Sequence, residues 1–345
     1  MNPNSPEKKK KVVVEEVTNW LRLYDDGSVD RTWTGPAKDL PLFTPIPPYT
    51  TPVNNITVHD LQNTFPPFRL YLPELSDLDN SGNLPVFLHF HGGGFCISQP
   101  SWPIYHHFYS RLCRQTPAII ISPYLPLAPE NRLPAAIDAA YSSLLWLRDV
   151  INSPEKGPVE YIRAVADFSR VFLIGDSSGG NLVHEVASRA GREADLDPIR
   201  ITGAVMLHPG FVRASRSRSE LENQSDSVLL TLEMVDKLLA LALPVGSTKD
   251  HRYTCPMGIG EEEIRALRLP PLFVGVAEGD LMRDTNLEYC EAMKRGGKEV
   301  VVHVSRGVGH AFYMNCFAVE SDPITRTRTD ELVLAIKDFV DHHHG

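Results

Sequence analysis

The stretch Arg170-Val171-Phe172-Leu173-Ile174-Gly175-Asp176-Ser177-Ser178-Gly179 decides the fold of this 345-residue chain. Its first five residues form a β-branched and apolar run, which predicts a buried strand. The last five follow the pattern G-x-S-x-G, and the segment from Asn181 to Ala190 predicts a helix. A serine at such a strand-to-helix turn stands above the sheet, next to the positive end of the helix. Ser177 is therefore the candidate nucleophile, with a plain strand-to-helix turn as the alternative interpretation.

Strand and helix patterns alternate along the chain on both sides of this turn. Strands are predicted over residues 55–59, 68–72, 86–90, 118–122, 170–174, 201–207, 272–277 and 300–304, and helices over 134–150, 284–294 and 329–342. A repeated order of strand and then helix predicts an α/β fold, with a mainly parallel sheet and helices on both faces. In such sheets, functional sites gather at the carboxyl ends of the strands.

Two segments depart from this alternation, and we expect them to form a cap over the site. In the first, about 1–45, the run Val12–Asn19 predicts a short helix and Asp25-Asp26-Gly27 predicts a hairpin turn. The prolines between residues 36 and 52 predict an extended connector. The second segment, 211–250, is first polar and charged and then predicts an amphipathic helix from 229 to 243. We expect one domain over 1–345, with the catalytic core at about 53–210 and 251–345.

Composition and charge narrow the possible functions. The chain is 42% hydrophobic and 22% charged, which is typical of a protein with a large core. Its net charge of −9, without an extended basic patch beyond Lys8–Lys11, argues against nucleic-acid binding. Val12–Val14 is too short for a signal-peptide core, and no apolar stretch is long enough to span a bilayer. Five scattered cysteines without a C-x-x-C pair indicate a reducing compartment and no structural zinc. We expect a cytoplasmic protein, with the nucleus as a second location.

A glycine run follows the predicted strand 86–90. The sequence His91-Gly92-Gly93-Gly94 frees backbone N–H groups to point at one spot, as an oxyanion hole requires. Gly92 and Gly93 are the candidate donors, and the N–H of Ser178, directly after the candidate nucleophile, is the third. A flexible loop without a catalytic role is the alternative interpretation.

A serine hydroxyl is a weak nucleophile at neutral pH and needs a base. Asp280 follows the strand 272–277 at a point where a side chain turns into the site. Asp284 is the competing acid, although its place at a predicted helix start suits an N-cap. Among the 13 histidines, only His310, in a glycine-rich loop after the last core strand, completes the order serine, acid, histidine.

Together these residues resemble the hormone-sensitive-lipase-like branch of the α/β-hydrolases, specifically plant carboxylesterases of the hypersensitivity-related group. The resemblance extends over nearly the whole chain, in the segments GSVDRTWTGP, HFHGGGFC, LPLAPENRLPAA, VFLIGDSSGGN, HPGFVR, LALPVGSTKDH and GVGHAFY. It implies an α/β-hydrolase core with a cap built partly from the N-terminal segment, and it implies neither a metal nor an organic cofactor. It also implies a catalytic triad of Ser177, Asp280 and His310 and an oxyanion hole of Gly92, Gly93 and Ser178.

Two related groups of the same fold differ from this chain at the catalytic residues. Gibberellin receptors share the fold but lack the catalytic histidine, whereas this chain has His310. Hydroxyisoflavanone dehydratases often carry threonine at the nucleophile, whereas this chain has Ser177. The usual segment DYRLAPE is replaced by the run Pro123–Glu130, so its local salt bridges must differ. Similarity to the receptors also implies a ligand pocket, with core packing as the alternative, formed by Ile104, Tyr105, Phe211, Val212, Leu238 and Tyr313.

The expected activity is hydrolysis of small carboxylic esters through an acyl-enzyme intermediate, by a monomer or weak homodimer. An apolar pocket would favour short-chain or aromatic esters. The alternative is a specialised plant-metabolism enzyme that uses the same triad for decarboxylation of an alkaloid ester, dehydration or transacylation. A ligand-sensing module is a third hypothesis, which the complete triad disfavours.

Overall fold

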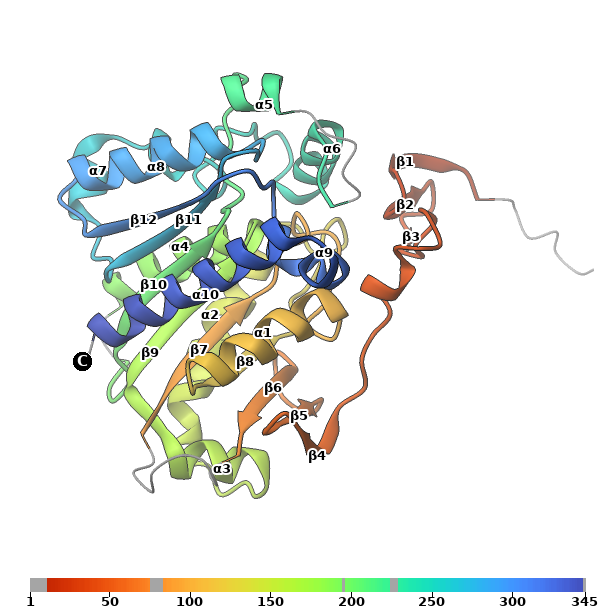
Figure 1. Cartoon of the computed structure of the whole chain (residues 1–345). Coiled ribbons are helices and arrows are strands. Elements are labelled where there is room, and N and C mark those ends of the chain that lie inside the picture. Colours follow the sequence, from red (N-terminus) through yellow and green to blue (C-terminus); the bar gives the residue numbers. More distant parts are fainter. Residues whose placement is uncertain (1–10, 75–82, 194–195, 224–228, 344–345) are drawn as a thin grey trace, which may run out of the picture.

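The computed structural model describes residues 11–74, 83–193, 196–223 and 229–343. A large sheet occupies the centre of the molecule (Figure 1). Its strands are β4 (Tyr49–Val53), β5 (Ile56–Leu61), β6 (Phe68–Pro73), β7 (Leu84–Phe90), β8 (Ile119–Pro123), β9 (Ala166–Asp176), β10 (Ile201–Leu207), β11 (Leu272–Ala277) and β12 (Val300–Ser305). Their spatial order is β12-β11-β10-β9-β7-β8-β6-β5-β4.

The strands from β12 to β8 are parallel, and β6, β5 and β4 continue the sheet antiparallel. Every residue of β7 and β11 is buried, as expected for strands that helices cover on both faces. The prediction of an α/β fold with a mainly parallel sheet is therefore confirmed.

Helices cover both faces of this sheet. The helices of the described residues are α1 (Pro103–Gln115), α2 (Ala135–Val150), α3 (Pro158–Val165), α4 (Ser178–Arg192), α5 (Arg218–Glu222), α6 (Leu232–Ala242), α7 (Glu261–Ala266), α8 (Arg283–Arg295), α9 (Cys316–Ser321) and α10 (Pro323–His342). Helices α1 and α10 pack against each other on one face, and α2 and α4 pack together on the other (Figure 1). The carboxyl ends of the parallel strands then open toward α5 and α6, which belong to the expected cap.

The N-terminal segment forms a second, three-stranded antiparallel sheet of β1 (Val13–Val17), β2 (Leu21–Tyr24) and β3 (Val29–Asp30). The predicted hairpin turn is confirmed, since Arg22 pairs with Asp30 across it. The helix predicted over Val12–Asn19 is wrong. That run is rich in valine, which favours extended backbone, and Val17 pairs with Leu21 of β2.

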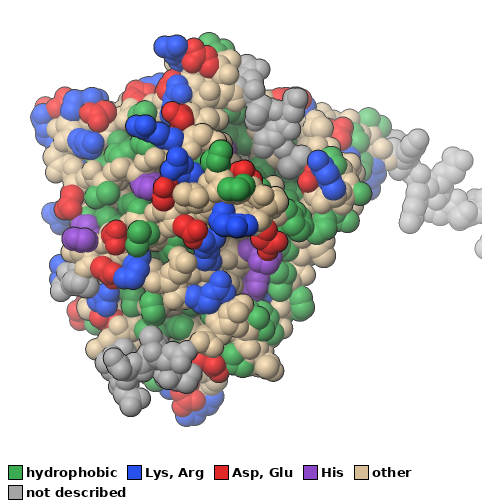
Figure 2. Space-filling model, viewed as in Figure 1, with side chains coloured by type: hydrophobic (Ala, Val, Ile, Leu, Met, Phe, Trp, Pro, Cys, Tyr) green, Lys and Arg blue, Asp and Glu red, His purple; other side chains and the backbone are tan. Residues whose placement is uncertain are grey.

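The proline-rich connector is only partly extended. It contains a short 3-10 helix, η1 (Leu40–Leu42), before β4 begins. Residues 1–10 and 224–228 of the expected cap segments lie outside the described residues, and the division into cap and core remains a prediction. No helix in the described part of the chain is long and apolar enough to cross a membrane. On the face shown in Figure 2, basic side chains lie among acidic ones.

Candidate active site

Ser177 occupies the turn between the end of β9 and the start of α4. Its φ of 50° and ψ of −125° place it in a strained backbone region for a residue with a side chain. Two N–H groups hold this turn by donating to the Ser177 carbonyl, from Gly180 at 2.8 Å and from Gly210 at 2.8 Å. A Cβ atom at Gly179 would lie 1.9 Å from the carbonyl oxygen of Phe90, so only glycine fits beneath the turn.

Asp280 and His310 follow the carboxyl ends of the neighbouring parallel strands β11 and β12, which brings them together. His310 Nδ1 lies 2.8 Å from Asp280 Oδ2. The other carboxylate oxygen of Asp280 accepts the N–H of Met282 at 3.0 Å. With the proton on Nδ1, the Nε2 atom of His310 is left as a proton acceptor. Asp284, the competing acid, instead accepts the N–H of Ser219 at 2.8 Å.

The two partners shift each other's pKa. Burial by itself lowers the pKa of His310, but the charge of Asp280 and their hydrogen bond outweigh burial, so the pKa is raised above 6.5. Burial raises the pKa of Asp280, but the charge and hydrogen bond of His310 outweigh it, so that pKa is lowered. Asp280 is therefore ionised at neutral pH and makes His310 a stronger base.

Ser177 and His310 line the same cavity, whose volume is about 80 Å³. Within the described residues, no hydrogen bond joins the Ser177 hydroxyl to His310. Such bonds are often long in free enzymes and tighten when substrate binds. The rest of the lining is mostly apolar and comes from far apart in the sequence, including Trp20, Leu229, Leu230, Val235, Leu239, Met282 and Met314.

The glycine run presents its second and third residues to this cavity. Gly93 and Gly94 line it with φ angles of 100° and 59°, which favour glycine. Ser178, at the first turn of α4, lines it as well. In the described part of the chain, the N–H groups of Gly93, Gly94 and Ser178 have no acceptor, so all three are available to a developing oxyanion.

Gly92 differs from the sequence-based expectation. Its N–H donates to Asp176 Oδ2 at 3.0 Å and so is not free to serve a substrate. The candidate donors are thus Gly93 and Gly94 rather than Gly92 and Gly93. Gly94, the third glycine of the same run, was not among the predicted donors.

Asp176 anchors the glycine loop from beneath. The carboxylate is 2% exposed, and burial raises its pKa to about 7. Besides Gly92, it contacts His89 Nε2 at 3.2 Å, and His89 Nδ1 lies 2.7 Å from the Ser122 hydroxyl. This chain of polar contacts fixes the loop that carries Gly93. Sequence reasoning missed this role, and the only available signal was the position of Asp176 beside Ser177.

His208 completes a group of three side chains with Asp280 and His310. Their ligand atoms all lie within 4.8 Å of one another, close enough for a metal ion. However, His208 Nδ1 accepts the N–H of Ala311 at 2.9 Å, and Asp280 is already paired with His310. Burial lowers the pKa of His208 to about 3, so it stays neutral. These contacts favour a role in holding the loop of His310 over metal binding.

The six residues expected to form the pocket divide into two groups. Ile104, Tyr105 and Leu238 line the cavity. The other three lie outside its lining and pack in the core instead. Phe211 lies 4.4 Å from the ring of Tyr289, Tyr313 lies 4.5 Å from the ring of Phe108, and Val212 is 1% exposed. Trp20 and Trp102 line the cavity without having been predicted.

Comparison with known proteins identifies the family and the fold of this chain. Residues 87–314 match the family of the alpha/beta hydrolase fold. The chain is 33% identical over 335 residues to probable carboxylesterase 6 of Arabidopsis thaliana, covering 96% of this chain and 92% of that protein. It is 36% identical over 332 residues to carboxylesterase 20 of the same plant, covering 91% and 93%.

Among solved structures, carboxyl esterase 2 of the fungus Tuber melanosporum superposes with a TM-score of 0.68 at 20% identity, covering 86% of this chain and 90% of that chain. This likeness shows a shared fold. The two plant relatives match over almost the full length of this chain. The chain therefore belongs to the plant carboxylesterases of the α/β-hydrolase fold.

Proposed function

We propose that this protein is a serine carboxylesterase that hydrolyses small carboxylic esters through an acyl-enzyme intermediate. The observation that carries the proposal is the shared cavity. It is lined by Ser177, by His310 paired with a buried Asp280, and by three residues with unbonded N–H groups. These are the parts that acyl transfer to a serine requires.

The reaction follows from the geometry of these groups. Nε2 of His310 takes the proton of the Ser177 hydroxyl as the serine oxygen attacks the ester carbonyl. The resulting oxyanion accepts hydrogen bonds from the N–H groups of Gly93, Gly94 and Ser178. His310 then gives the proton to the leaving alcohol, and a water molecule releases the acid by the same route. Asp280 holds the ring in the required tautomer and stabilises its cation.

The small, largely apolar cavity beside Ser177 supports a short acyl or alcohol group there. The same groups would also serve decarboxylation of an alkaloid ester, dehydration or transacylation, which product analysis separates from simple hydrolysis. A cytoplasmic location and a monomeric or weakly dimeric state remain predictions from the sequence.

The test is the turnover of p-nitrophenyl acetate and butyrate by wild type and by Ser177→Ala, with products identified by mass spectrometry. We expect the variant to lose at least about 10³-fold in kcat, as triad substitutions do. Ser188→Ala is the matched control. Ser188 is buried on α4, the helix that follows Ser177, and it lines no part of the cavity. Among the described residues its hydroxyl has no hydrogen-bond partner. Near-normal turnover by Ser177→Ala, or negligible turnover by folded wild type, would contradict the proposal.

A further inference from the structure

A second, larger cavity lies beside the catalytic one. Its volume is about 410 Å³, against about 80 Å³ for the cavity at Ser177. Four residues, Trp20, Ile97, Ser98 and Trp102, line both cavities, which therefore adjoin each other. An ester that reacts at Ser177 therefore has a large neighbouring space within reach of its non-reacting part.

Aromatic rings dominate the second cavity. Trp20, Trp33, Phe43 and Trp102 all line it, and they contact one another as a single cluster. The ring centroids of Trp20 lie 4.7 Å from Trp33 and 4.7 Å from Phe43, and Phe43 lies 5.4 Å from Trp102. Because some of these rings meet edge to face and others are tilted, the cavity can pack against both the edge and the face of a planar aromatic ligand.

The local chain holds the ring of Trp33 in place before any ligand arrives. The indole Nε1–H donates to the carbonyl of Pro36 at 3.2 Å. The ring also lies directly on Gly35, where a Cβ atom would be 2.2 Å from it. A side chain fixed in this way loses little further freedom when a ligand binds, which favours affinity.

The charged residue in the lining is already bonded elsewhere. Arg31 donates to the carbonyl oxygens of Cys96 at 2.6 Å and Ala128 at 2.9 Å, and it forms an ion pair with Glu130 at 2.5 Å. Its guanidinium therefore ties the N-terminal segment to the core and is not available to an anion. The cavity suits an uncharged aromatic group.

We propose that this aromatic cavity is a subsite for a planar aromatic group of the substrate, which lies alongside Trp20 and Trp102 while the ester carbonyl lies at Ser177 in the adjoining cavity. The proposal rests on the proposed esterase function and extends it to a substrate class. The preferred substrates are esters in which a short acyl or alcohol part lies at Ser177 and a naphthyl-sized group lies among the four rings.

Two variants test the subsite at residues that line the second cavity and not the catalytic one. Thr44 is exposed and lines only the second cavity, so Thr44→Trp fills it with little risk to folding. Trp33→Ala removes one ring of the cluster. Trp146→Ala is the matched control, since Trp146 is also half-buried but packs on Phe68 at 4.2 Å and lines neither cavity.

The readout is kcat/KM for ethyl acetate, for 2-naphthylmethyl acetate and for ethyl 2-naphthylacetate. The last two esters place the ring on the alcohol and on the acid, respectively. We expect Thr44→Trp and Trp33→Ala to lower kcat/KM at least about tenfold for one or both naphthyl esters, which corresponds to the loss of about 1.4 kcal/mol of binding. With Thr44→Trp, kcat/KM for ethyl acetate should change less than about twofold. With Trp146→Ala, the ratio of kcat/KM for each naphthyl ester to kcat/KM for ethyl acetate should stay unchanged.

Equal losses for all three esters, or no loss for either naphthyl ester, would overturn the subsite. If wild type hydrolyses none of them, the esterase proposal fails, and calorimetric binding of 2-naphthylmethanol then decides the subsite alone. If wild type binds 2-naphthylmethanol and Thr44→Trp does not, the subsite is supported. If wild type does not bind it, the subsite is overturned.

Discussion

Asp280 controls the electrostatics of the site at the scale of single residues. The carboxylate is 1% exposed and contacts the ring of His310 at 2.8 Å. His208 Nδ1 lies 4.0 Å from the same oxygen, but that atom accepts the N–H of Ala311 and His208 stays neutral. The charge of Asp280 therefore acts mainly on His310, which explains why the pKa of a buried histidine is raised.

The acid limb of the pH profile tests this pairing. As pH falls through the raised pKa of His310, the ring becomes protonated and no longer accepts the serine proton, so kcat/KM of wild type should fall with an apparent pKa above 6.5. In Asp280→Asn, burial still lowers the pKa of His310, and only the weaker effect of the Asp176 charge opposes it. The limb should then move to lower pH, and kcat should fall by about 10⁴-fold. Hydrolysis of p-nitrophenyl acetate from pH 5 to 9 measures both effects.

Asp284→Asn is the control for this prediction. Asp284 is a nearby carboxylate that bonds to Ser219 and Arg283 rather than to His310. Its removal should leave the position of the acid limb unchanged. A profile that shifts with Asp284→Asn but not with Asp280→Asn would exchange the roles of the two residues.

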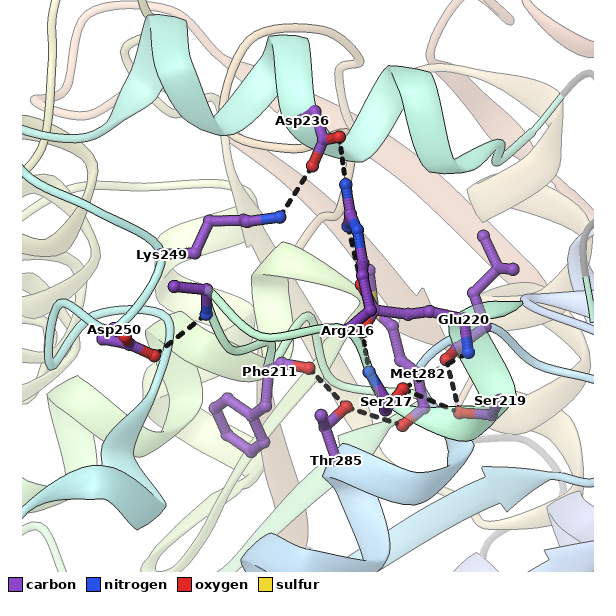
Figure 3. A network of polar contacts seen from close by, with 12 residues as sticks. Phe211, Arg216, Ser217, Ser219, Glu220, Asp236, Lys249, Asp250, Met282 and Thr285 are labelled. Carbon is purple, nitrogen blue, oxygen red and sulfur yellow. Dashed lines mark hydrogen bonds and ion pairs between the residues drawn. The ribbon is translucent and has the colours of Figure 1, made fainter. Parts of the chain in front are cut away.

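Helix α6 is the element that joins cap and cavity. One side of it lines the catalytic cavity with Val235, Leu238 and Leu239. A Cβ atom at Gly94 would lie 2.6 Å from Leu238, so this helix packs directly on the glycine loop. Away from the cavity, Asp236 pairs with Arg216 and, at 2.8 Å, with Lys249 (Figure 3). The position of the helix thus affects both the pocket and the oxyanion loop.

Arg216 is the residue whose loss should loosen this element. It bridges Asp236 of α6 and Glu220 of α5, and Glu220 is 2% exposed (Figure 3). Arg216→Met keeps the apolar stem but leaves a buried carboxylate without its cation, which should cost about 2 kcal/mol of unfolding free energy. We also expect KM to rise more than kcat falls. Denaturant unfolding and ester kinetics measure these effects.

The matched control for Arg216→Met is two positions further along the chain, at the start of α5. Arg218 pairs with Glu222, but both side chains are largely exposed, so water already solvates them. Arg218→Met should change neither stability nor KM measurably. Equal effects of the two variants would mean that the bridge to α6 does not hold the cap.

The whole molecule depends on how the N-terminal segment is fastened to the α/β core. Arg31 provides one attachment, and the aromatic cluster around Trp20 provides a second. A third comes from Lys237 of α6, which donates to the carbonyl of Glu16 in β1 at 2.7 Å. In Figure 1 the small sheet β1–β3 lies beside α6 at the edge of the core.

Arg31→Met should loosen this attachment across the molecule. The variant loses the ion pair to Glu130 and two hydrogen bonds to core carbonyls, and we expect amide hydrogen exchange in residues 13–43 to accelerate at least tenfold while that of β7 and β9 is unchanged. Glu130→Gln keeps a hydrogen-bond acceptor and should accelerate exchange less. Exchange in 13–43 that is indifferent to Arg31→Met would show that the aromatic contacts alone hold the segment.

Much of the fold could be predicted because it is encoded locally. The strands around Ser177 and the helices α2, α8 and α10 follow from apolar periodicity, and their order implies a parallel sheet. Helix α1 was not predicted, and β1 was predicted as a helix. Segments such as these are compatible with both helix and strand, and tertiary contacts decide between the two. The contacts are with the core for α1 and with strand β2 for β1.

The sequence by itself determined the order of Ser177, Asp280 and His310 and the strand ends that carry them, because each lies in a motif readable within a few residues. Only the tertiary structure decided which N–H groups are free. Gly92 and Asp176 are 84 positions apart, yet their hydrogen bond excludes Gly92 and leaves Gly93 and Gly94. The pocket likewise combines Trp20, Leu238 and His310. Contacts between residues distant in sequence depend on how the elements pack, and no local pattern records them.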